Sequence, residues 1–142
     1  MATVLIIGAS KGIGLEALKQ ALSASHSVRA LARTASQIKV EHPRLEKIDG
    51  DALDSSTVRH ALAGVDVVIQ SLGMPAGPDL IFGSVKLFSE ATRILVDAMK
   101  ESGTRRLICV TGFGAGDSRG RGGLLYSLAF SVVIVVGGAV AA

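Results

Sequence analysis

The stretch "TVLIIGASKGIG", Thr3 to Gly14, decides the fold. Its first five residues, Thr3 to Ile7, are typical of a buried strand, and a helical pattern resumes after Gly14. Three glycines, Gly8, Gly12 and Gly14, fall between the strand and the helix. Glycine at this density costs folding entropy, so we expect a ligand to approach the main chain closely at this turn.

The composition restricts the class of protein. Of the 142 residues, 49% are hydrophobic and 19% are charged, which predicts one domain over residues 1–142 with a sizeable core. The formal net charge of +3 is too small and too scattered for a nucleic-acid surface. The lone Cys109 lies in apolar "LICV" and cannot form an internal disulfide, so we expect a buried thiol and a cytoplasmic protein. The run "TVLII" is too short to be the apolar region of a signal peptide.

Short aliphatic runs alternate with helix-length spans along the chain. The runs that predict strands are "TVLII" (3–7), "SVRALA" (27–32), "RLEKI" (44–48), "VDVVIQ" (65–70) and "RLICVT" (106–111). This alternation is typical of βαβ units, in which a parallel sheet is covered on both faces. We therefore predict the α/β class, with a Rossmann-type doubly wound parallel sheet.

The spans between the runs predict helices that cover this sheet. Asp54 caps a short helix that ends near Ala63, before Gly64, and Ser84 begins a longer helix that ends at Gly103. The apolar stripes expected to pack on the sheet are Leu15, Leu18 and Leu22 in the first helix and Phe88, Ala91, Leu95 and Met99 in the longest.

A glycine-rich turn between a strand and a helix is a ready anion site. Backbone N–H groups point outward there, at the positive end of the helix dipole. We predict that a dinucleotide binds here: Gly8 permits the tight turn, Gly12 admits the diphosphate, and Gly14 lets helix and strand pack closely. Ser10, Lys11 and Ile13 belong to the same predicted site. The spacing is Gly-x-x-x-Gly-x-Gly, and a purely structural turn is the alternative.

The end of the second predicted strand indicates which dinucleotide binds. An acid there would accept hydrogen bonds from the ribose of NAD, whereas an arginine suits the 2′-phosphate of NADP. The stretch "RALART" places Arg33 at this position, with Ser10 and Lys11 on the same rim. We therefore predict NADP(H) as the cofactor. The alternative is that Arg33 and Lys11 are solvated surface charges.

Two further segments follow predicted strands. In "GDALD" (50–54), Asp51 and the main chain of Ala52 are predicted to meet the adenine, although Asp51 alternatively only caps a turn. In "QSLG" (70–73), Ser71, Leu72 and Gly73 are predicted to line the path of the diphosphate and the nicotinamide ribose. Gly73 equally suits the turn into "MPAGP".

The motifs "VLIIGASKGIG", "ALAR", "GDALD", "VVIQSLG" and "RLICVTGFGAGD", in this order and spacing, resemble one family. They are similar to the atypical short-chain dehydrogenase/reductases with an NAD(P)H-binding, NmrA-like fold, and most of all to the flavin reductase and biliverdin-IXβ reductase branch. The resemblance covers residues 3–117, and residues 118–142 are an atypical apolar ending.

The resemblance implies a Rossmann fold and an NADP preference through Arg33. The cofactor contacts that it implies are Ser10, Lys11, Asp51, Ser71 and Gly73. It also implies that Thr111, which we take as the candidate catalytic residue, ends the fifth strand beside the nicotinamide and the substrate, with Gly112 as a further cofactor contact. In the reductase branch this hydroxyl residue is usually serine.

The acid/base pair of typical short-chain dehydrogenases, Tyr-x-x-x-Lys, is absent. The only tyrosine, Tyr126, has Phe130 in the lysine position, so we expect Tyr126 to be a packing residue. His26, His42 and His60 are expected at the surface or in loops, and no metal site is predicted. Hydride transfer to a flavin-like acceptor can still proceed through positioning alone.

Two functions follow from these observations. We predict an NADPH-dependent reductase that transfers hydride to a planar small-molecule acceptor such as a flavin, tetrapyrrole or quinone, with neither nucleic acid nor membrane as a partner. The alternative is an NADP(H)-binding redox sensor or interaction module without turnover, as in other NmrA-like proteins. A structural domain that binds no dinucleotide is the third possibility.

The last segment, "GGLLYSLAFSVVIVVGGAVAA" (122–142), carries no charge. It is compatible with a buried helix followed by a strand, with an altered or incomplete chain, or with a membrane anchor. Members of the resembled family usually continue for about two strands and a helix beyond the position of Asp117. We therefore expect the sheet to be shortened at its C-terminal side.

Overall fold

The computed structural model describes residues 1–72 and 84–110, except for the side chains of residues 84–86. The chain divides into two compact units, Met1–Gly73 with Phe88–Val110 and Met74–Leu87 with Thr111–Ala142. The first unit contains nearly all of the described residues. The predictions for residues 118–142, including Tyr126, lie outside the described residues, and the single domain therefore stays a prediction.

Strands and helices alternate along the described chain. They are β1 (Thr3–Ile7), α1 (Gly12–Ser23), β2 (Ser27–Ala32), the 3-10 helix η1 (Ala35–Gln37), β3 (Leu45–Asp49), α2 (Ser55–Leu62), β4 (Val67–Gln70), α4 (Ser84–Ser102) and β5 (Arg106–Cys109). The bounds of β1 and β2 are as predicted, and the other strands differ from the prediction only at their ends.

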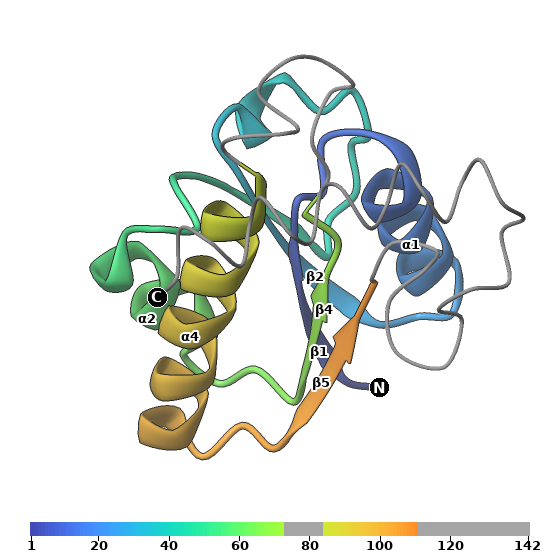
Figure 1. Ribbon diagram of the computed structural model, residues 1–142. Coiled ribbons are helices and arrows are strands. Elements are labelled where there is room, and N and C mark those ends of the chain that lie inside the picture. Colours follow the sequence, from blue (N-terminus) through green and yellow to red (C-terminus); the bar gives the residue numbers. More distant parts are fainter. Residues whose placement is uncertain (73–83, 111–142) are drawn as a thin grey trace, which may run out of the picture. The chain divides into compact units, whose positions relative to one another are not determined.

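The described strands form one parallel sheet, in the order β3-β2-β1-β4-β5 (Figure 1). The chain adds β2 and β3 on one side of β1 and then crosses to add β4 and β5 on the other side. This is the Rossmann order, and the predicted fold class is confirmed. In such sheets ligands bind at the carboxyl ends of the strands where the order reverses, which here are β1 and β4.

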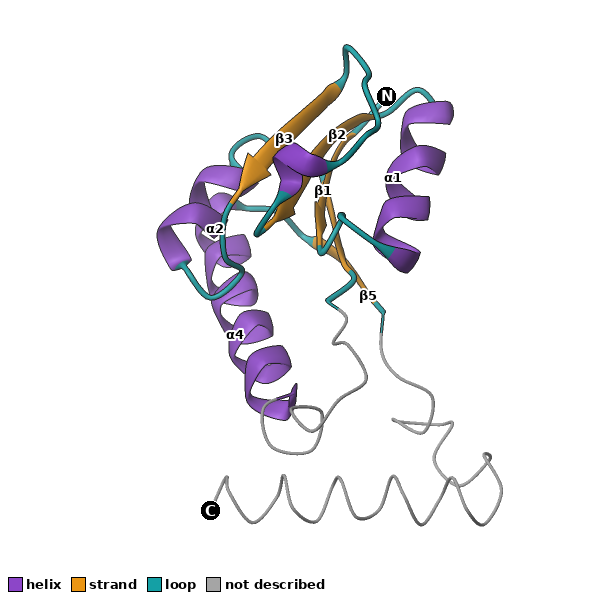
Figure 2. Ribbon diagram, turned by 90° about the horizontal axis from the view of Figure 1, so that it is seen from above, coloured by secondary structure: helices purple, strands orange, loops and turns teal. Residues whose placement is uncertain are grey.

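Helices cover both faces of the sheet, with α1 on one face and α2 and α4 on the other (Figure 2). Successive residues of β1 therefore point into two different cores: Val4 and Ile6 pack with the residues of α1, whereas Leu5 and Ile7 pack with those of α2 and α4. All four side chains are at most 6% exposed. Burial on both faces explains why β1 is apolar without interruption.

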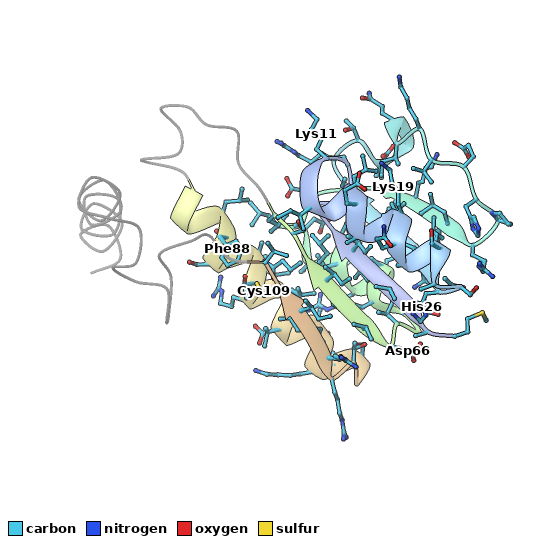
Figure 3. All side chains as sticks on the ribbon, turned by 90° about the vertical axis from the view of Figure 1, so that its right-hand side faces the viewer. Lys11, Lys19, His26, Asp66, Phe88 and Cys109 are labelled. Atoms are coloured by element: carbon cyan, nitrogen blue, oxygen red, sulfur yellow. The ribbon has the colours of Figure 1, made fainter. Side chains whose placement is uncertain are left out.

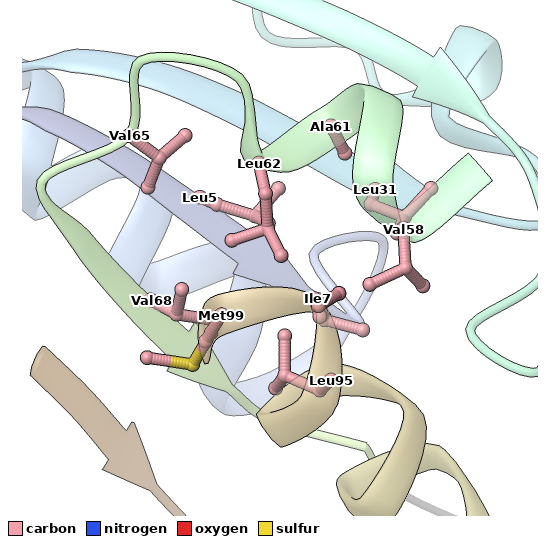
Figure 4. Close-up of a cluster of buried hydrophobic side chains, with 11 residues drawn as sticks. Leu5, Ile7, Leu31, Val58, Ala61, Leu62, Val65, Val68, Leu95 and Met99 are labelled. Carbon is pink, nitrogen blue, oxygen red and sulfur yellow. The ribbon is translucent and has the colours of Figure 1, made fainter. Parts of the chain in front are cut away.

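The core between the sheet and the pair α2 and α4 is the larger of the two (Figure 4). Its buried members are Leu5, Ile7, Leu31, Val58, Ala61, Leu62, Val65, Val68, Leu95, Ala98 and Met99. On the other face, Leu18 and Leu22 of α1 are buried and Leu15 is partly buried. The predicted stripes of α1 and α4 thus lie against the sheet, with Phe88 half-buried near the start of α4.

The predicted helix ends are also confirmed. The Asp54 carboxylate accepts a hydrogen bond from the Ser56 N–H at 3.0 Å and so caps α2. The hydroxyl of Thr57 also donates to it, and these bonds hold the pKa of Asp54 below its usual value. Gly64 after α2 and Gly103 after α4 have φ angles of +69° and +77°. Residues with a Cβ rarely adopt this left-handed conformation, so glycine is favoured at both helix ends.

The prediction that Cys109 is buried is wrong, because its side chain is exposed. Cys109 belongs to β5, the last strand of the described sheet, and the preceding residue in the same strand, Ile108, is 44% exposed. Burial of a short apolar run depends on whether both sides of its strand are covered, and sequence alone does not give this. Of the helices in segments 1–72 and 84–110, none has the length and apolar character that crossing a membrane requires.

Candidate functional site

Gly8 lies where the carboxyl ends of β1, β2 and β4 meet, at the point where the strand order reverses (the switch point). Its N–H donates to the Leu31 carbonyl at 2.9 Å, and the Ser71 N–H donates to the Ile7 carbonyl at 2.9 Å. The φ of Gly8 is +85°, and a Cβ at Gly8 would lie 2.3 Å from the Ser71 carbonyl oxygen. The approach of the chain after β4 therefore requires glycine here, as the predicted tight turn does.

The other two glycines of the turn differ from each other. Gly14 is buried, and a Cβ there would lie 2.2 Å from the Gly8 carbonyl oxygen, so Gly14 lets α1 pack on the turn as predicted. Gly12 has a φ of +54°, but, apart from its chain neighbours and its own helix backbone, no atom of the described residues lies within 4 Å of the position of its Cβ. Among the described residues, the space in front of Gly12 is thus open, whereas the space around Gly8 and Gly14 is filled by the protein itself.

No side chain in the described segments caps the N-terminus of α1. Lys11, at the N-cap position, is extended and makes no capping side-chain hydrogen bond, and the first turn contains no acid. By contrast, the carboxylate of Asp54 caps α2. The N–H groups of the first turn of α1 and the positive end of its dipole are thus available to an anion. Beside them, Ser10 is half-buried, and Lys11 and Ile13 are exposed.

Arg33 lies beside the glycine turn. It directly follows β2, and the parallel register that pairs Ile7 with Leu31 places Arg33 level with Ala9 when continued. Its side chain is exposed and forms no ion pair with any residue in the described segments. Its guanidinium group is therefore available to an anionic ligand, as the predicted 2′-phosphate contact requires.

Figure 3 shows the two ends of the sheet, with Lys11 at one end and His26 and Asp66 at the other. The Asp66 carboxylate accepts a hydrogen bond from the Thr3 N–H at 2.7 Å, and Nδ1 of His26 accepts one from the Ala2 N–H at 3.2 Å. His42 binds the Arg44 N–H in the loop before β3, and His60 is exposed on α2. The three histidines lie in loops or at the surface, as predicted.

Asp51 makes a local turn after β3. Its carboxylate accepts a hydrogen bond from the Leu53 N–H at 2.9 Å, as in the turn-capping alternative. The following residue, Ala52, is half-buried and packs against the larger core. Gly50 is required at this turn, because a Cβ there would lie 2.4 Å from Cγ2 of Thr57. Turn capping occupies one carboxylate oxygen of Asp51 and leaves the predicted adenine contact untested.

Asp49, the last residue of β3, was not among the predicted site residues. Its carboxylate accepts a hydrogen bond from the Ser36 N–H at 2.8 Å, and the bonds from the Ser36 backbone and hydroxyl hold the pKa of Asp49 below its usual value. The contact joins the end of β3 to η1, directly after Arg33. An acid at the end of the third predicted strand was the available signal, but its partner is not visible in the sequence.

The residues after β4 reach the switch point. Ser71 is half-buried and bonded to β1, and Leu72 packs against the larger core. Gln70, also not singled out from the sequence, is fully buried, and its Nε2 donates to the Thr92 hydroxyl at 2.8 Å. The remaining predicted residues, Gly73, Thr111 and Gly112, lie outside the described residues.

One family model and several known proteins match the sequence. A family model described as NAD(P)H-binding matches residues 8–133. An uncharacterized oxidoreductase of Schizosaccharomyces pombe is 36% identical over 78 residues, which are 50% of this chain and 27% of that protein.

Solved structures share the fold. ChuY, described as an anaerobilin reductase of Escherichia coli O157:H7, superposes with a TM-score of 0.68 at 26% identity, over 95% of this chain and 63% of its own. The oxidoreductase YlbE of Lactococcus lactis superposes with a TM-score of 0.74 at 18% identity, over 93% of this chain and 58% of its own. The chain thus spans 27% to 63% of the length of these three proteins.

Proposed function

Because the chain belongs to the NAD(P)H-binding family and has oxidoreductases among its relatives, we propose that it is an NADPH-dependent reductase. It transfers hydride to a planar acceptor of the flavin, tetrapyrrole or quinone type. The observation that carries the proposal is the turn at Gly12, which is open and uncapped among the residues that the structure describes, beside Arg33, which has no ion pair with any of those residues. A glycine turn that served structure alone would not need this open space or the free cation next to it.

The described residues fit a dinucleotide phosphate. The first turn of α1 with Ser10 and Lys11 would hold the diphosphate, and Arg33 would hold the 2′-phosphate through its planar set of donors. Asp51 and Ala52 are proposed for the adenine. Bound NADPH supplies the hydride, so the task of the protein is to bind and orient the cofactor and its acceptor.

The proposals for the reacting end extend beyond the described residues. Ser71, Leu72 and Gly73 are proposed for the nicotinamide ribose, and Thr111 with Gly112 for the reacting end of the cofactor. The planar acceptor is supported by the likeness to ChuY at 26% identity, since that protein is described as an anaerobilin reductase. We also propose membership of the NmrA-like branch of the short-chain dehydrogenases, and a cytoplasmic location in view of the single cysteine.

Titration of the chain with NADPH and with NADH, followed by cofactor fluorescence, tests the proposal. We expect Arg33→Glu to weaken NADPH binding by roughly 10- to 100-fold, because a charge-assisted phosphate contact is lost and a like charge is added. NADH binding should change little. The control is Arg105→Glu, which makes the same charge change at an exposed site before β5, at the opposite end of the sheet.

The results separate cofactor preference from turnover. Equal losses of NADPH and NADH affinity in Arg33→Glu would refute the 2′-phosphate contact, and no binding of either cofactor by the unmodified chain would refute the whole proposal. The second candidate is a non-catalytic NADP(H)-binding redox sensor or interaction module, which the absence of a Tyr-x-x-x-Lys pair favours. Steady NADPH oxidation in the presence of a flavin supports the reductase, and tight binding without oxidation of NADPH by any planar acceptor supports the sensor.

A further inference from the structure

The end of β3 lies next to the proposed 2′-phosphate contact. The register of β2 and β3 pairs Ala32 with Asp49, so the Asp49 carboxylate belongs to the strand beside Arg33 and is one residue short of it. Hydrogen bonds from the backbone and the hydroxyl of Ser36 hold the pKa of Asp49 below its usual value. A carboxylate of β3 can pair with an arginine of β2 where the two residues are opposite each other in the register.

Strands β2 and β3 contain one such arginine–carboxylate pair. Arg29 of β2 pairs in register with Glu46 of β3, and its Nε donates to the Glu46 carboxylate at 2.6 Å. Four residues further along β2, Arg33 has no ion pair in the described segments, although Asp49 follows Glu46 by three residues. Arg29 and Glu46 are direct partners in the register, whereas the partner of Asp49 is Ala32, and the Asp49 carboxylate instead accepts a hydrogen bond from the Ser36 N–H at 2.8 Å.

We propose that Asp49 is a positioning residue for NADP(H) recognition: by binding Ser36 it fixes the segment after β2 and so positions the Arg33 guanidinium for the 2′-phosphate. This inference rests on the proposed function and deepens it. Asp49 itself is not proposed to contact the cofactor; it acts through Arg33.

The segment after β2 has few other anchors. Among residues 33–38, only Ala35 and Ile38 are buried, and the remaining side chains are exposed. Loss of the Asp49 bond would leave these two side chains in the core, so the fold would persist. The exposed backbone at Ser36 would gain freedom, and ordering it again upon binding would cost affinity for a ligand that uses Arg33. NADH has no 2′-phosphate and would not bear this cost.

The test compares Asp49→Ala with Asp49→Asn in the full chain. We expect Asp49→Ala to weaken NADPH binding about tenfold and to leave NADH binding within about twofold. The side-chain oxygen of asparagine can still accept the Ser36 N–H, so Asp49→Asn should retain most of the NADPH affinity. The matched control is Asp66→Ala, which removes another exposed carboxylate that accepts a backbone N–H, at the opposite end of the sheet. It should change neither affinity.

The outcomes distinguish this inference from the proposed function. If the unmodified chain prefers NADPH and Asp49→Ala lowers both affinities equally, leaves both unchanged, or raises NADPH affinity, Asp49 does not position Arg33. If Asp49→Asn loses as much NADPH affinity as Asp49→Ala, the inference is also overturned. If the unmodified chain binds neither cofactor, or binds both equally, the proposed NADP(H) site fails and the inference fails with it.

Discussion

Replacement of Gly8 by alanine should destabilise the fold strongly, because two separate requirements for glycine meet at this residue. Its φ is +85°, in the left-handed region that side chains disfavour. A Cβ would also lie 2.3 Å from the carbonyl oxygen and 2.8 Å from the carbonyl carbon of Ser71. Both are backbone atoms, so no change of rotamer can relieve the contact.

The size of the effect follows from these two terms. The left-handed conformation costs a residue with a Cβ about 1–2 kcal/mol. Forcing an extra methyl group against packed atoms costs a further 1–3 kcal/mol, roughly. Gly8→Ala should therefore lower the free energy of unfolding by about 2–5 kcal/mol, out of a typical total of about 5–15 kcal/mol.

Gly12→Ala is the matched control. The φ of Gly12 is +54°, so the conformational cost is similar, but no described atom beyond its chain neighbours and its own helix backbone lies within 4 Å of its Cβ position. We expect a loss of about 1–2 kcal/mol. A methyl group there would project into the space proposed for the diphosphate, so Gly12→Ala should weaken NADPH binding, and the bulkier Gly12→Val should abolish binding of NADPH and NADH while the chain still folds.

Urea denaturation followed by circular dichroism gives the free energies of unfolding of the three proteins, and cofactor titration gives the affinities. Gly8→Ala should unfold at a clearly lower urea concentration than Gly12→Ala. If Gly8→Ala and Gly12→Ala lower the free energy of unfolding equally, the prediction is wrong, because the contact with Ser71 is the expected source of the difference between them. Normal cofactor binding by Gly12→Val would show that the turn serves structure alone.

Two further predictions concern polar contacts away from the turn. Arg29→Met should cost about 1.5–3 kcal/mol in urea denaturation, because Nη1 of Arg29 donates to the Ala61 and Ala63 carbonyls at the end of α2 and its side chain is only 24% exposed. Lys19→Met breaks only an exposed ion pair on α1 and should cost at most about 0.5 kcal/mol, so equal costs would contradict the prediction. The hydroxyls of Thr57 and Ser56 hold the pKa of Asp54 below its usual value of 3.8, so the stability it contributes is present above that value and is lost as the pH falls through the lowered pKa. Asp54→Asn should accordingly have a lower melting temperature than the unmodified chain at about pH 7 and a similar one at about pH 2, and a deficit independent of pH would contradict this.

The features that were predicted correctly depend on interactions within short stretches. "TVLII" is apolar throughout because β1 is buried on both faces, and this is visible in five residues. Asp54 caps α2 through a residue two positions further on, and Gly64 ends the same helix. The glycine turn and Arg33 were placed at one end of the sheet because parallel strands bring their carboxyl ends together.

The features that were missed depend on partners far along the chain. Gly8 was predicted for a tight turn, but its close approach to the Ser71 carbonyl was not, and Asp49 binds Ser36 thirteen residues earlier, on a segment that only the register of β2 and β3 brings near. Cys109 was expected to be buried because its neighbours are apolar, but β5 is the last strand of the described sheet and the side chain is exposed.

Local patterns were enough to predict the order of the strands and helices, the glycine turn after β1 and the arginine after β2, because periodicity, capping and glycine spacing act locally. Only the tertiary structure decided which groups are free. Arg29 and Arg33 lie on the same stretch of chain, yet one is bound to Glu46 and the other is unpaired in the described segments. That difference arises from the strand register, which places Glu46 opposite Arg29 but places Ala32, not Arg33, opposite Asp49. An ion pair forms only where folding brings two charges into contact.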